Sequence, residues 1–287
     1  MRSALVLFAF NRPAHLTSTA HSLKRALNAL SQEAGSDTRL AIHVAIDGAR
    51  PNPYAARGEA EQVAASEGAA CALIPSASIR REPVNRGLPA HLIAVLDDVF
   101  QEADRAICIE DDIEMSPTIL LALLRTSDEL MRAQRGALHV VGAAPQHRDG
   151  SLEHQALLVT KEAHEAVKPL LREYIDRFGL DGAANPNGYG RRDHQGIYEW
   201  SGAIARSSGL SEPKGTSQDR MRELGWRRAS VTLRGLPMRL VRHRGLWGQH
   251  NTPWHALRTG QLFQRLDSRP WSEIESDLVR WSNEIRD

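Results

Sequence analysis

Hydrophobic and polar positions alternate in blocks along the first half of the chain, and the blocks predict strands and helices in turn. Short continuous apolar runs are typical of strands buried on both faces, whereas apolar residues spaced three and four apart indicate amphipathic helices. Strands are expected at 4–10, 40–47, 71–75, 106–112 and 137–144, and helices at 14–34, 55–69, 88–103 and from Ser116-Pro117 onward. This order predicts an α/β fold with an open, mostly parallel sheet flanked by helices.

The second half of the chain has a less regular pattern. We expect a helix at 161–178, a long loop rich in Gly, Asn and Pro at 179–196, short helices at 198–208 and 217–225, a strand and a Gly-rich turn within 236–250, and helical spacing over 253–286. Long loops inside compact domains are usually functional or mobile. No internal repeat or linker-like segment interrupts the pattern, so residues 1–287 are interpreted as one domain.

Composition excludes some partners. Lys and Arg total 36 and Asp and Glu total 35, so no net field favours nucleic acid or an anionic membrane. The two cysteines, Cys71 and Cys108, lie in apolar runs and are interpreted as reduced core residues. The apolar run 4–10 follows Arg2 like a signal peptide, but it stops at Asn11-Arg12-Pro13 without a cleavage site. No run approaches a membrane span, and we expect a cytoplasmic protein.

Three adjacent acids, Glu110, Asp111 and Asp112, end the predicted strand 106–112. Ligands bind beyond the carboxyl ends of the strands in open α/β sheets, and Asp47 ends another predicted strand at that edge. Adjacent carboxylates repel one another, and a divalent cation such as Mg²⁺ or Mn²⁺ relieves that repulsion. The alternative is that one of the acids caps the following loop while the others are solvated.

Four segments, in this order, resemble glycosyltransferases of the GT-A fold, and most of all the N-acetylglucosaminyltransferase I type and its bacterial family 2-like relatives. They are "LVLFAFNRPAHLTSTAHSL", "AIDG", "NRGLPAHLIAVLDDVF" and "AICIEDDIEMSP". The resemblance covers roughly residues 4–135 and continues more loosely through 198–221 and 242–250. It implies a nucleotide-sugar-binding half at about 1–135, and an acceptor half with C-terminal helices at about 136–287.

The resemblance also implies roles for the residues around the acid triplet. Asp112 would coordinate the metal. Asp111 would contact the ribose or lie behind the metal ligands, and Glu110 would face the sugar or the nucleotide. Arg12 would approach the diphosphate or the uracil, and Asp47 would accept a hydrogen bond from the uracil. The alternatives are that Arg12 is an ordinary surface cation and that Asp47 forms a turn before Gly48.

Four further residues receive roles in the same way. Asn85, before Gly87, would touch the nucleotide or only shape a turn. Asp219 in "SQDRM" would be the catalytic base, although Gln218 replaces the Trp of the family motif; the alternative is a helix N-cap or a first-turn acid that suits the helix dipole. Trp200 would stack on an acceptor sugar or pack in the core. His250 would bind the metal or be structural.

The function implied by the resemblance is a metal-dependent, inverting glycosyltransferase. It would use Mn²⁺ or Mg²⁺ to move a sugar from a UDP-sugar, such as UDP-GlcNAc, to a glycan or another hydroxyl acceptor. Two other classes remain as alternatives: a non-catalytic module of the same fold that binds a nucleotide sugar or a glycan, and a sugar nucleotidyltransferase. The nucleotidyltransferase is disfavoured because the segment after the first strand, "NRPAHL", lacks glycine.

Overall fold

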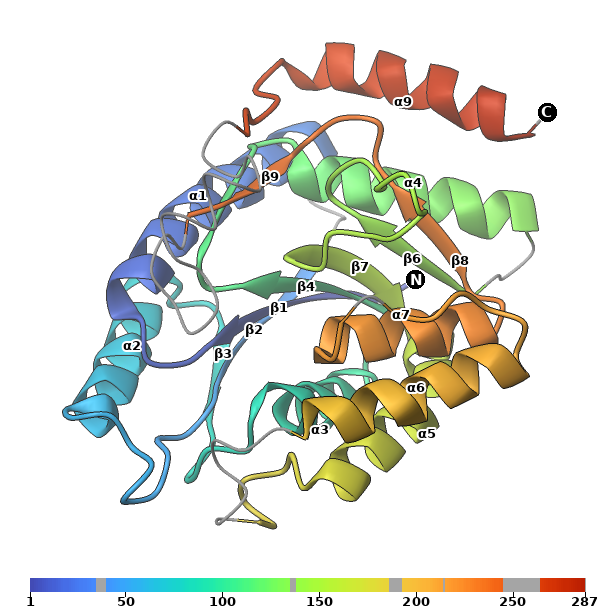
Figure 1. Cartoon of the computed structure of the whole chain (residues 1–287). Coiled ribbons are helices and arrows are strands. Elements are labelled where there is room, and N and C mark those ends of the chain that lie inside the picture. The colour runs from blue at the N-terminus through green and yellow to red at the C-terminus, as the bar shows by residue number, and fades with distance from the viewer. Residues whose placement is uncertain (35–39, 135–137, 186–192, 214, 245–263, 287) are drawn as a thin grey trace.

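A seven-stranded mixed sheet forms the centre of the protein (Figure 1). The computed structural model describes residues 1–34, 40–134, 138–185, 193–213, 215–244 and 264–286. The strands lie in the order β3-β2-β1-β4-β7-β6-β8. Their bounds are β1 Ser3–Ala9, β2 Leu40–Ile46, β3 Ser78–Arg81, β4 Arg105–Glu110, β6 His139–Gly142, β7 Ala156–Thr160 and β8 Thr232–Gly235.

The sheet is mostly parallel. Parallel pairing joins β1 to β2 and β4, β2 to β3, and β6 to β8, whereas β7 runs antiparallel to both of its neighbours, β4 and β6. The predicted α/β class with an open, mostly parallel sheet is therefore confirmed. Strands from both halves of the sequence contribute to this one sheet.

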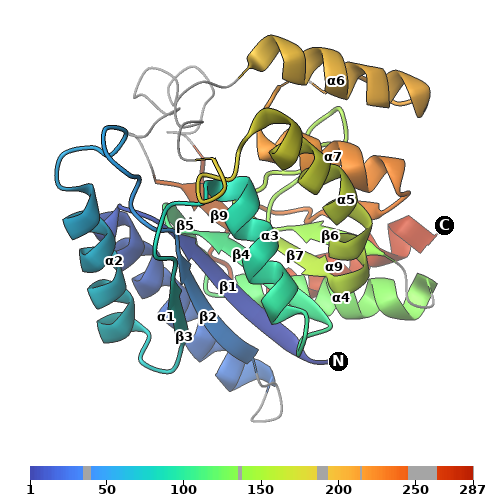
Figure 2. The same cartoon turned by 90° about the horizontal axis from the view of Figure 1, so that it is seen from below.

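Helices cover both faces of the sheet, as Figures 1 and 2 show. On one face lie α1 Pro13–Ala34, α2 Glu59–Leu73 and α4 Ile119–Gln134, with α9 Trp271–Arg286 packed over α4. On the other lie α3 Leu88–Val99, α5 Lys161–Phe178 and α7 Gln218–Arg228, with α6 His194–Ser207 outside α5 and α7. Among the described helices, none combines the length and the apolar run needed to cross a membrane.

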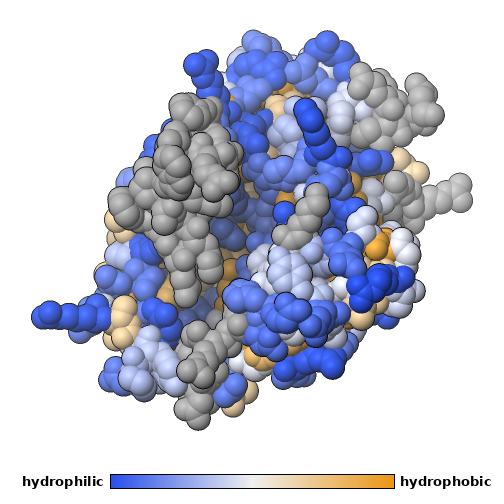
Figure 3. All heavy atoms as spheres, viewed as in Figure 1, coloured by the Kyte–Doolittle hydropathy of each residue, from blue (hydrophilic) through white to orange (hydrophobic). Residues whose placement is uncertain are grey.

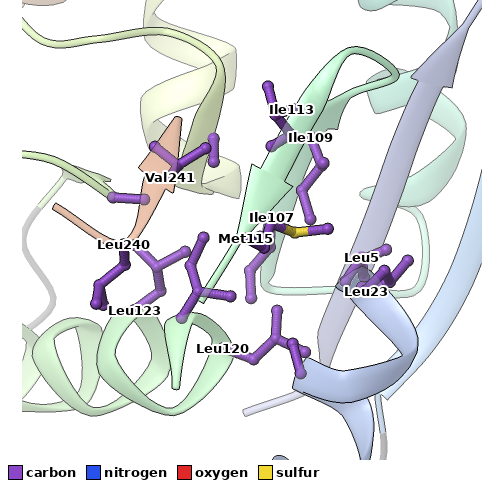
Figure 4. Packing of buried hydrophobic residues seen from close by; sticks show 14 of the residues in the cluster. Leu5, Leu23, Ile107, Ile109, Ile113, Met115, Leu120, Leu123, Leu240 and Val241 are labelled. Carbon is purple, nitrogen blue, oxygen red and sulfur yellow. The ribbon is translucent and has the colours of Figure 1, made fainter. Parts of the chain in front are cut away.

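Successive residues of the central strands point into opposite layers, as the strand period of two requires. In β1, Leu5 and Leu7 pack in the layer with α1 and α4, whereas Val6 and Phe8 pack in the layer with α3 and α5. Figure 4 shows side chains from β1, β4, α1 and α4 gathered in the first layer. On the face seen in Figure 3, hydrophilic residues predominate and apolar residues appear only in scattered spots.

A second, two-stranded sheet lies beyond β4. Its strands, β5 Ile113–Met115 and β9 Val241–His243, pair antiparallel, so that Ile113 lies opposite His243. The predicted strand within 236–250 is therefore short, and its Gly-rich turn falls outside the described residues. The strands β5, β7 and β8 were not predicted at all.

The strand predicted at 71–75 is wrong. Residues up to Leu73 continue α2, and β3 begins only at Ser78. Ala70 and Ile74, four residues apart, are both buried in the core beside α1. A short apolar run that follows alanines fits a helix end as well as a strand, and here tertiary packing selects the helix. The real edge strand, Ser-Ile-Arg-Arg, is too polar to be recognised as a strand.

Several predicted helices have different bounds, among them two in the second half of the chain. The helical spacing expected over 253–286 gives a helix only from Trp271, residues 264–270 are not helical, and residues 253–263 lie outside the described part. The helix predicted at 198–208 starts earlier, at His194, within the predicted loop 179–196, because Asp193 caps it by accepting from the Gly196 N–H.

We expect His91 on α3 to make the stability of this fold sensitive to acid. Its side chain is 1% exposed, its ring meets the ring of Phe8 edge to face, and burial lowers its pKa from 6.5 to about 4. The folded state therefore binds fewer protons than the unfolded state, and stability falls as the pH drops from about 6.5 towards about 4. We expect this histidine to lower the free energy of unfolding by about 2 kcal/mol between pH 7 and pH 5.

Urea unfolding of His91→Leu at the two pH values measures this contribution. The variant should lose less stability on acidification than the wild type, and the exposed control His21→Leu should lose as much as the wild type. Equal acid sensitivity of His91→Leu and the wild type would contradict the assignment.

Candidate functional site

The carboxyl ends of three parallel strands meet at one edge of the sheet. Ala9 of β1 pairs with Ile46 of β2, and Phe8 pairs with Glu110 of β4. Asn11-Arg12, Asp47 and the acid triplet follow these strand ends directly. The structure thus places the predicted strand-end residues at the edge where open α/β sheets bind ligands.

Arg12 lies between the two aspartates of the triplet. Its Nη1 is 2.6 Å from Oδ2 of Asp112, and its Nη2 contacts Oδ1 of Asp111. Both aspartates are buried, whereas the Arg12 side chain is 34% exposed. Arg12 is therefore bound into the acid cluster, while part of its side chain stays exposed. Burial raises the pKa of Asp111 to about 6, against the attraction of Arg12.

His243 on β9 is the second partner of Asp112. Its Nε2 lies 3.0 Å from Oδ2 of Asp112, and both side chains are buried. Burial alone raises the pKa of Asp112, but the hydrogen bond from His243 and the charge of Arg12 outweigh it and lower the pKa to about 2. Oδ1 of Asp112 is buried and has no hydrogen-bond partner among the described residues. A buried carboxylate oxygen without a partner is costly unless a cation or a donor reaches it.

Hydroxyl groups of α1 hold the turn that carries the triplet. Oγ1 of Thr19 donates towards the carbonyl oxygens of Asp111 and Ile113, 2.8 and 2.7 Å away, and accepts from the Ile113 N–H. Oγ of Ser22 accepts from the Met115 N–H at 3.3 Å. Because both hydroxyls are buried, the turn after β4 is anchored to the helix that follows β1.

Asp47 organises a neighbouring loop. Its Oδ1 accepts from the backbone N–H groups of Gly48 and Arg86, and its Oδ2 accepts from the Asn85 side chain and the Gly87 N–H, all at 2.8–3.0 Å. These bonds occupy about as many positions as a carboxylate offers. The predicted residues Asp47 and Asn85 are thus brought together. The contacts of Asp47 match the alternative in which it shapes the turn before Gly48.

Gly48 permits the close approach of this loop. A Cβ atom at position 48 would lie 2.3 Å from the carbonyl carbon of Val84. Only glycine lets the chain after β2 lie against the loop before α3.

Glu110 and Asp219 line the same small cavity. Its volume is about 20 Å³, enough for roughly one water molecule. The lining residues are Phe8, Leu88, Leu92, Cys108, Ile109, Glu110, His154, Gln218, Asp219 and Arg222. Burial and the charges of Asp219 and Asp112 raise the pKa of Glu110 well above its usual range. The predicted base therefore faces the acid triplet across a space that fits one oxygen atom.

Asp219 occupies the first turn of α7 without capping it. The cap is Ser217, whose hydroxyl accepts from the Arg220 N–H. The Asp219 side chain is 31% exposed, and Nε2 of Gln218 donates to its Oδ1 at 3.4 Å. The N-cap interpretation of Asp219 is therefore wrong, and a first-turn acid or a base both agree with this position.

Trp200 stays apart from this cluster. Nε1 of Trp200 donates to Glu173 at 2.8 Å, and the ring stacks on Tyr174 and meets Phe178 edge to face. These contacts join α6 to α5 and match the packing alternative, so an acceptor role for Trp200 stays a prediction. His250 lies outside the described residues.

Sequence reasoning missed His243, His154 and Glu223. His243 lies between two arginines in "LVRHRG", and a three-residue strand has too little pattern to show its partner. His154 precedes β7, a strand that was not predicted. Glu223 stands four residues after Asp219 and therefore shares its helix face, which was the one available signal.

Another group of potential metal ligands lies between α3 and α5. Asp97, His164 and Glu165 bring ligand atoms within 4.8 Å of one another. The carboxylate of Asp97 already contacts Nε2 of His164, Nζ of Lys168 and Nη2 of Arg172 at 2.8–3.0 Å. Since its partners carry positive charge or an N–H, this group is a salt-bridge cluster that joins two helices.

Comparison with known proteins gives only distant likenesses. No family model matches the chain, and no curated protein matches it. Similar solved structures include S. aureus TarS 1–349 in complex with UDP-GlcNAc (TM-score 0.31, 12% identity, 51% of this chain and 35% of that chain) and S. aureus TarS (0.34, 10%, 54% and 23%). A third is a protein from Desulfovibrio desulfuricans G20, provisionally described as a nucleotide-diphospho-sugar transferase (0.37, 14%, 82% and 80%).

This chain spans about a third of the TarS 1–349 chain and less than a quarter of the TarS chain that it matches. All three TM-scores lie below 0.5, and none of the three structures is of the N-acetylglucosaminyltransferase I type by its description. Likenesses this weak carry no argument about the function of this chain.

Proposed function

We propose that this protein is a metal-dependent glycosyltransferase that moves a sugar from a nucleotide diphosphate sugar to a hydroxyl acceptor. The observation that carries the proposal is the arrangement at the sheet edge. A buried Asp112, paired with Arg12 and His243, lies two residues beyond Glu110, which shares a one-water cavity with Asp219. Such a site separates cation-binding carboxylates from a carboxylate that can take a proton.

The residues present fit a divalent cation. Oδ1 of Asp112 is buried without a partner among the described residues, and an imidazole stands beside the other oxygen. Asp112 would hold Mn²⁺ or Mg²⁺ through Oδ1, and His243 would take the part predicted for His250 once its Nε2 has given up its proton. Mg²⁺ and Mn²⁺ commonly keep several waters and bind substrate phosphates, so they need few ligands from the protein. Bound there, the ion would act as a Lewis acid on the departing diphosphate.

The protein's own groups would divide the remaining tasks. Arg12 would reach the diphosphate with the N–H groups that its aspartates do not use. Asp47 and Asn85 would keep the loop before α3 in place beside the nucleotide. Asp219 would accept the proton of the attacking hydroxyl, with Glu110 on the other side of the cavity. Inversion and the uridine base rest on the resemblance of the sequence motifs.

Melting curves with UDP, GDP, ADP and CMP, each with Mn²⁺ or with EDTA, test this proposal. We expect UDP with Mn²⁺ to raise the melting temperature most, by about 5 °C at a ligand concentration near 100 times Kd. The shift should largely disappear in EDTA. A preference for GDP would overturn the uridine assignment alone. The absence of a metal-dependent shift with every nucleoside diphosphate would overturn the proposed function.

A further inference from the structure

A buried histidine stands behind the proposed base. The side chain of His154, in the segment before β7, is 7% exposed and lines the same cavity as Asp219. Nδ1 lies 3.6 Å from Oδ1 of Asp219, and Nε2 lies 3.7 Å from Oε2 of Glu223. Both nitrogens are buried without a hydrogen-bond partner among the described residues. One ring thus points its two nitrogens at two different carboxylates.

The two carboxylates differ in how they are held. Oε1 of Glu223 accepts from Nε and Nη2 of Arg227 at 3.1 and 2.7 Å, and the Glu223 side chain is 7% exposed. Burial raises the pKa of Glu223, but His154 and Arg227 outweigh it and lower the pKa. Asp219 is 31% exposed, and its nearest side-chain donor is Gln218, at 3.4 Å. Glu223 is therefore the fixed anion of the pair, and Asp219 is the one that a substrate can reach.

Trp226 fixes the plane of the imidazole. The two rings are stacked, with centroids 5.8 Å apart and planes 10° apart, and Nε1 of Trp226 donates to the carbonyl of Ala163 at 3.1 Å. Because Asp219, Glu223 and Trp226 share one face of α7, the helix sets both the stacking surface and the two carboxylates. The guanidinium of Arg222 lies 4.8 Å from the centroid of the Trp226 ring.

We propose that His154 is a positioning residue that takes over the proton from Asp219 during transfer. Glu223 binds the Nε2–H, which leaves Nδ1 unprotonated and directed at Asp219. This deepens the proposed function and rests on it. Distances of 3.6 and 3.7 Å are slightly longer than hydrogen bonds, and contacts of this kind commonly tighten when substrate binds.

The proton balance of the step is complete. The acceptor oxygen forms a bond to the anomeric carbon, and the bond from that carbon to the diphosphate breaks with its electron pair. The acceptor proton passes to Asp219 and then to Nδ1 of His154. The imidazolium formed lies between two carboxylates and later returns its proton to solvent through Asp219. Packing alone is the competing explanation, since a ring on Trp226 needs no nitrogen.

The tautomer of His154 is measurable without any substrate. In ¹⁵N-histidine-labelled protein, the resonances of His154 are identified by their loss in His154→Phe, a variant that keeps a ring on Trp226. We expect the Nε2–H tautomer in the wild type and a loss of that preference in Glu223→Ala. An Nδ1–H tautomer in the wild type, or the same tautomer in both proteins, would overturn the proposal.

Kinetics test the link to Asp219. With UDP-GlcNAc and Mn²⁺, and with water as the acceptor, His154→Phe should lower kcat for UDP release about 10-fold or more. The KM should stay nearly constant. In the Asp219→Asn background the same substitution should have little further effect, because the two groups act in sequence. His164→Phe is the control. His164 is also buried, but it does not line the cavity that contains Asp219, so this variant should keep the wild-type kcat.

Additive losses in the double variant would show that His154 only packs, and would overturn the proposal. If the wild-type protein releases no UDP, the proposed function fails, and the NMR result alone decides whether Glu223 sets the tautomer of His154.

Discussion

Asp112→Asn should lower the Mn²⁺-dependent affinity for UDP at least about 100-fold, equivalent to about 3 kcal/mol. Asparagine keeps the shape of the side chain but lacks the negative charge that a cation requires. The variant also loses the attraction of Arg12 and His243 for a carboxylate, so the fold should be about 2 kcal/mol less stable near neutral pH. Titration calorimetry with and without Mn²⁺ measures the affinity, and urea unfolding measures the stability.

Two further variants test whether the loss of affinity is specific to Asp112. Asp111→Asn should weaken binding less, because Asp111 contacts Arg12 and the Phe10 N–H but not His243 in the described structure. Glu114→Gln is the matched control: Glu114 is an acid of the same segment that pairs with Arg242 and Arg244, so nucleotide binding should not change. Unchanged metal-dependent affinity in Asp112→Asn would remove the basis for a metal site.

Asp219→Asn should lower kcat by about 10²-fold or more and leave UDP binding nearly unchanged. A carboxylate that only removes a proton contributes to the transition state and little to the affinity for the donor. The position of Asp219 agrees with this expectation, because the one-water cavity separates Asp219 from the acid triplet. Steady-state kinetics with UDP-GlcNAc, first with water and then with a true acceptor, give the measurement.

Glu162→Gln provides the control for helix electrostatics. Glu162 is an acid in the first turn of α5, as Asp219 is in α7. If Asp219 only stabilised its helix, the two variants would each cost at most about 1 kcal/mol of stability and little activity. A product with the anomeric configuration of the donor, established by NMR, would exclude Asp219 as an inverting base.

The site was predictable wherever it depends on strand ends. Arg12, Asp47 and the acids at 110–112 each follow a continuous apolar run, and parallel strands bring their carboxyl ends to one edge. That rule brings Arg12 to the same edge as the two aspartates, but their ion pairs were not predicted. It could not show that Asp47 would be enclosed by four donors, because this depends on the path of the loop before α3.

His243 and His154 could not be predicted for a different reason. Both reach the site through elements with little local pattern: a three-residue strand for His243 and the segment before an unpredicted strand for His154. The antiparallel pairing of β5 with β9 brings His243 to Asp112. The helical spacing of Asp219, Glu223 and Trp226 shows that they share a face of α7, but it does not show which residue that face meets.

The sequence by itself determined the α/β class, the mostly parallel sheet and the strand-end position of the acid triplet. The spacing of apolar residues, with a period of 2 in strands and 3.6 in helices, shows which face of each element is buried. This spacing can be recognised from a few neighbouring residues. The tertiary structure decided that 71–75 ends a helix, that His243 contacts Asp112 in addition to Arg12, and that His154 lies between Asp219 and Glu223. These outcomes depend on contacts between segments far apart in the chain, and local periodicity carries no information about the partner.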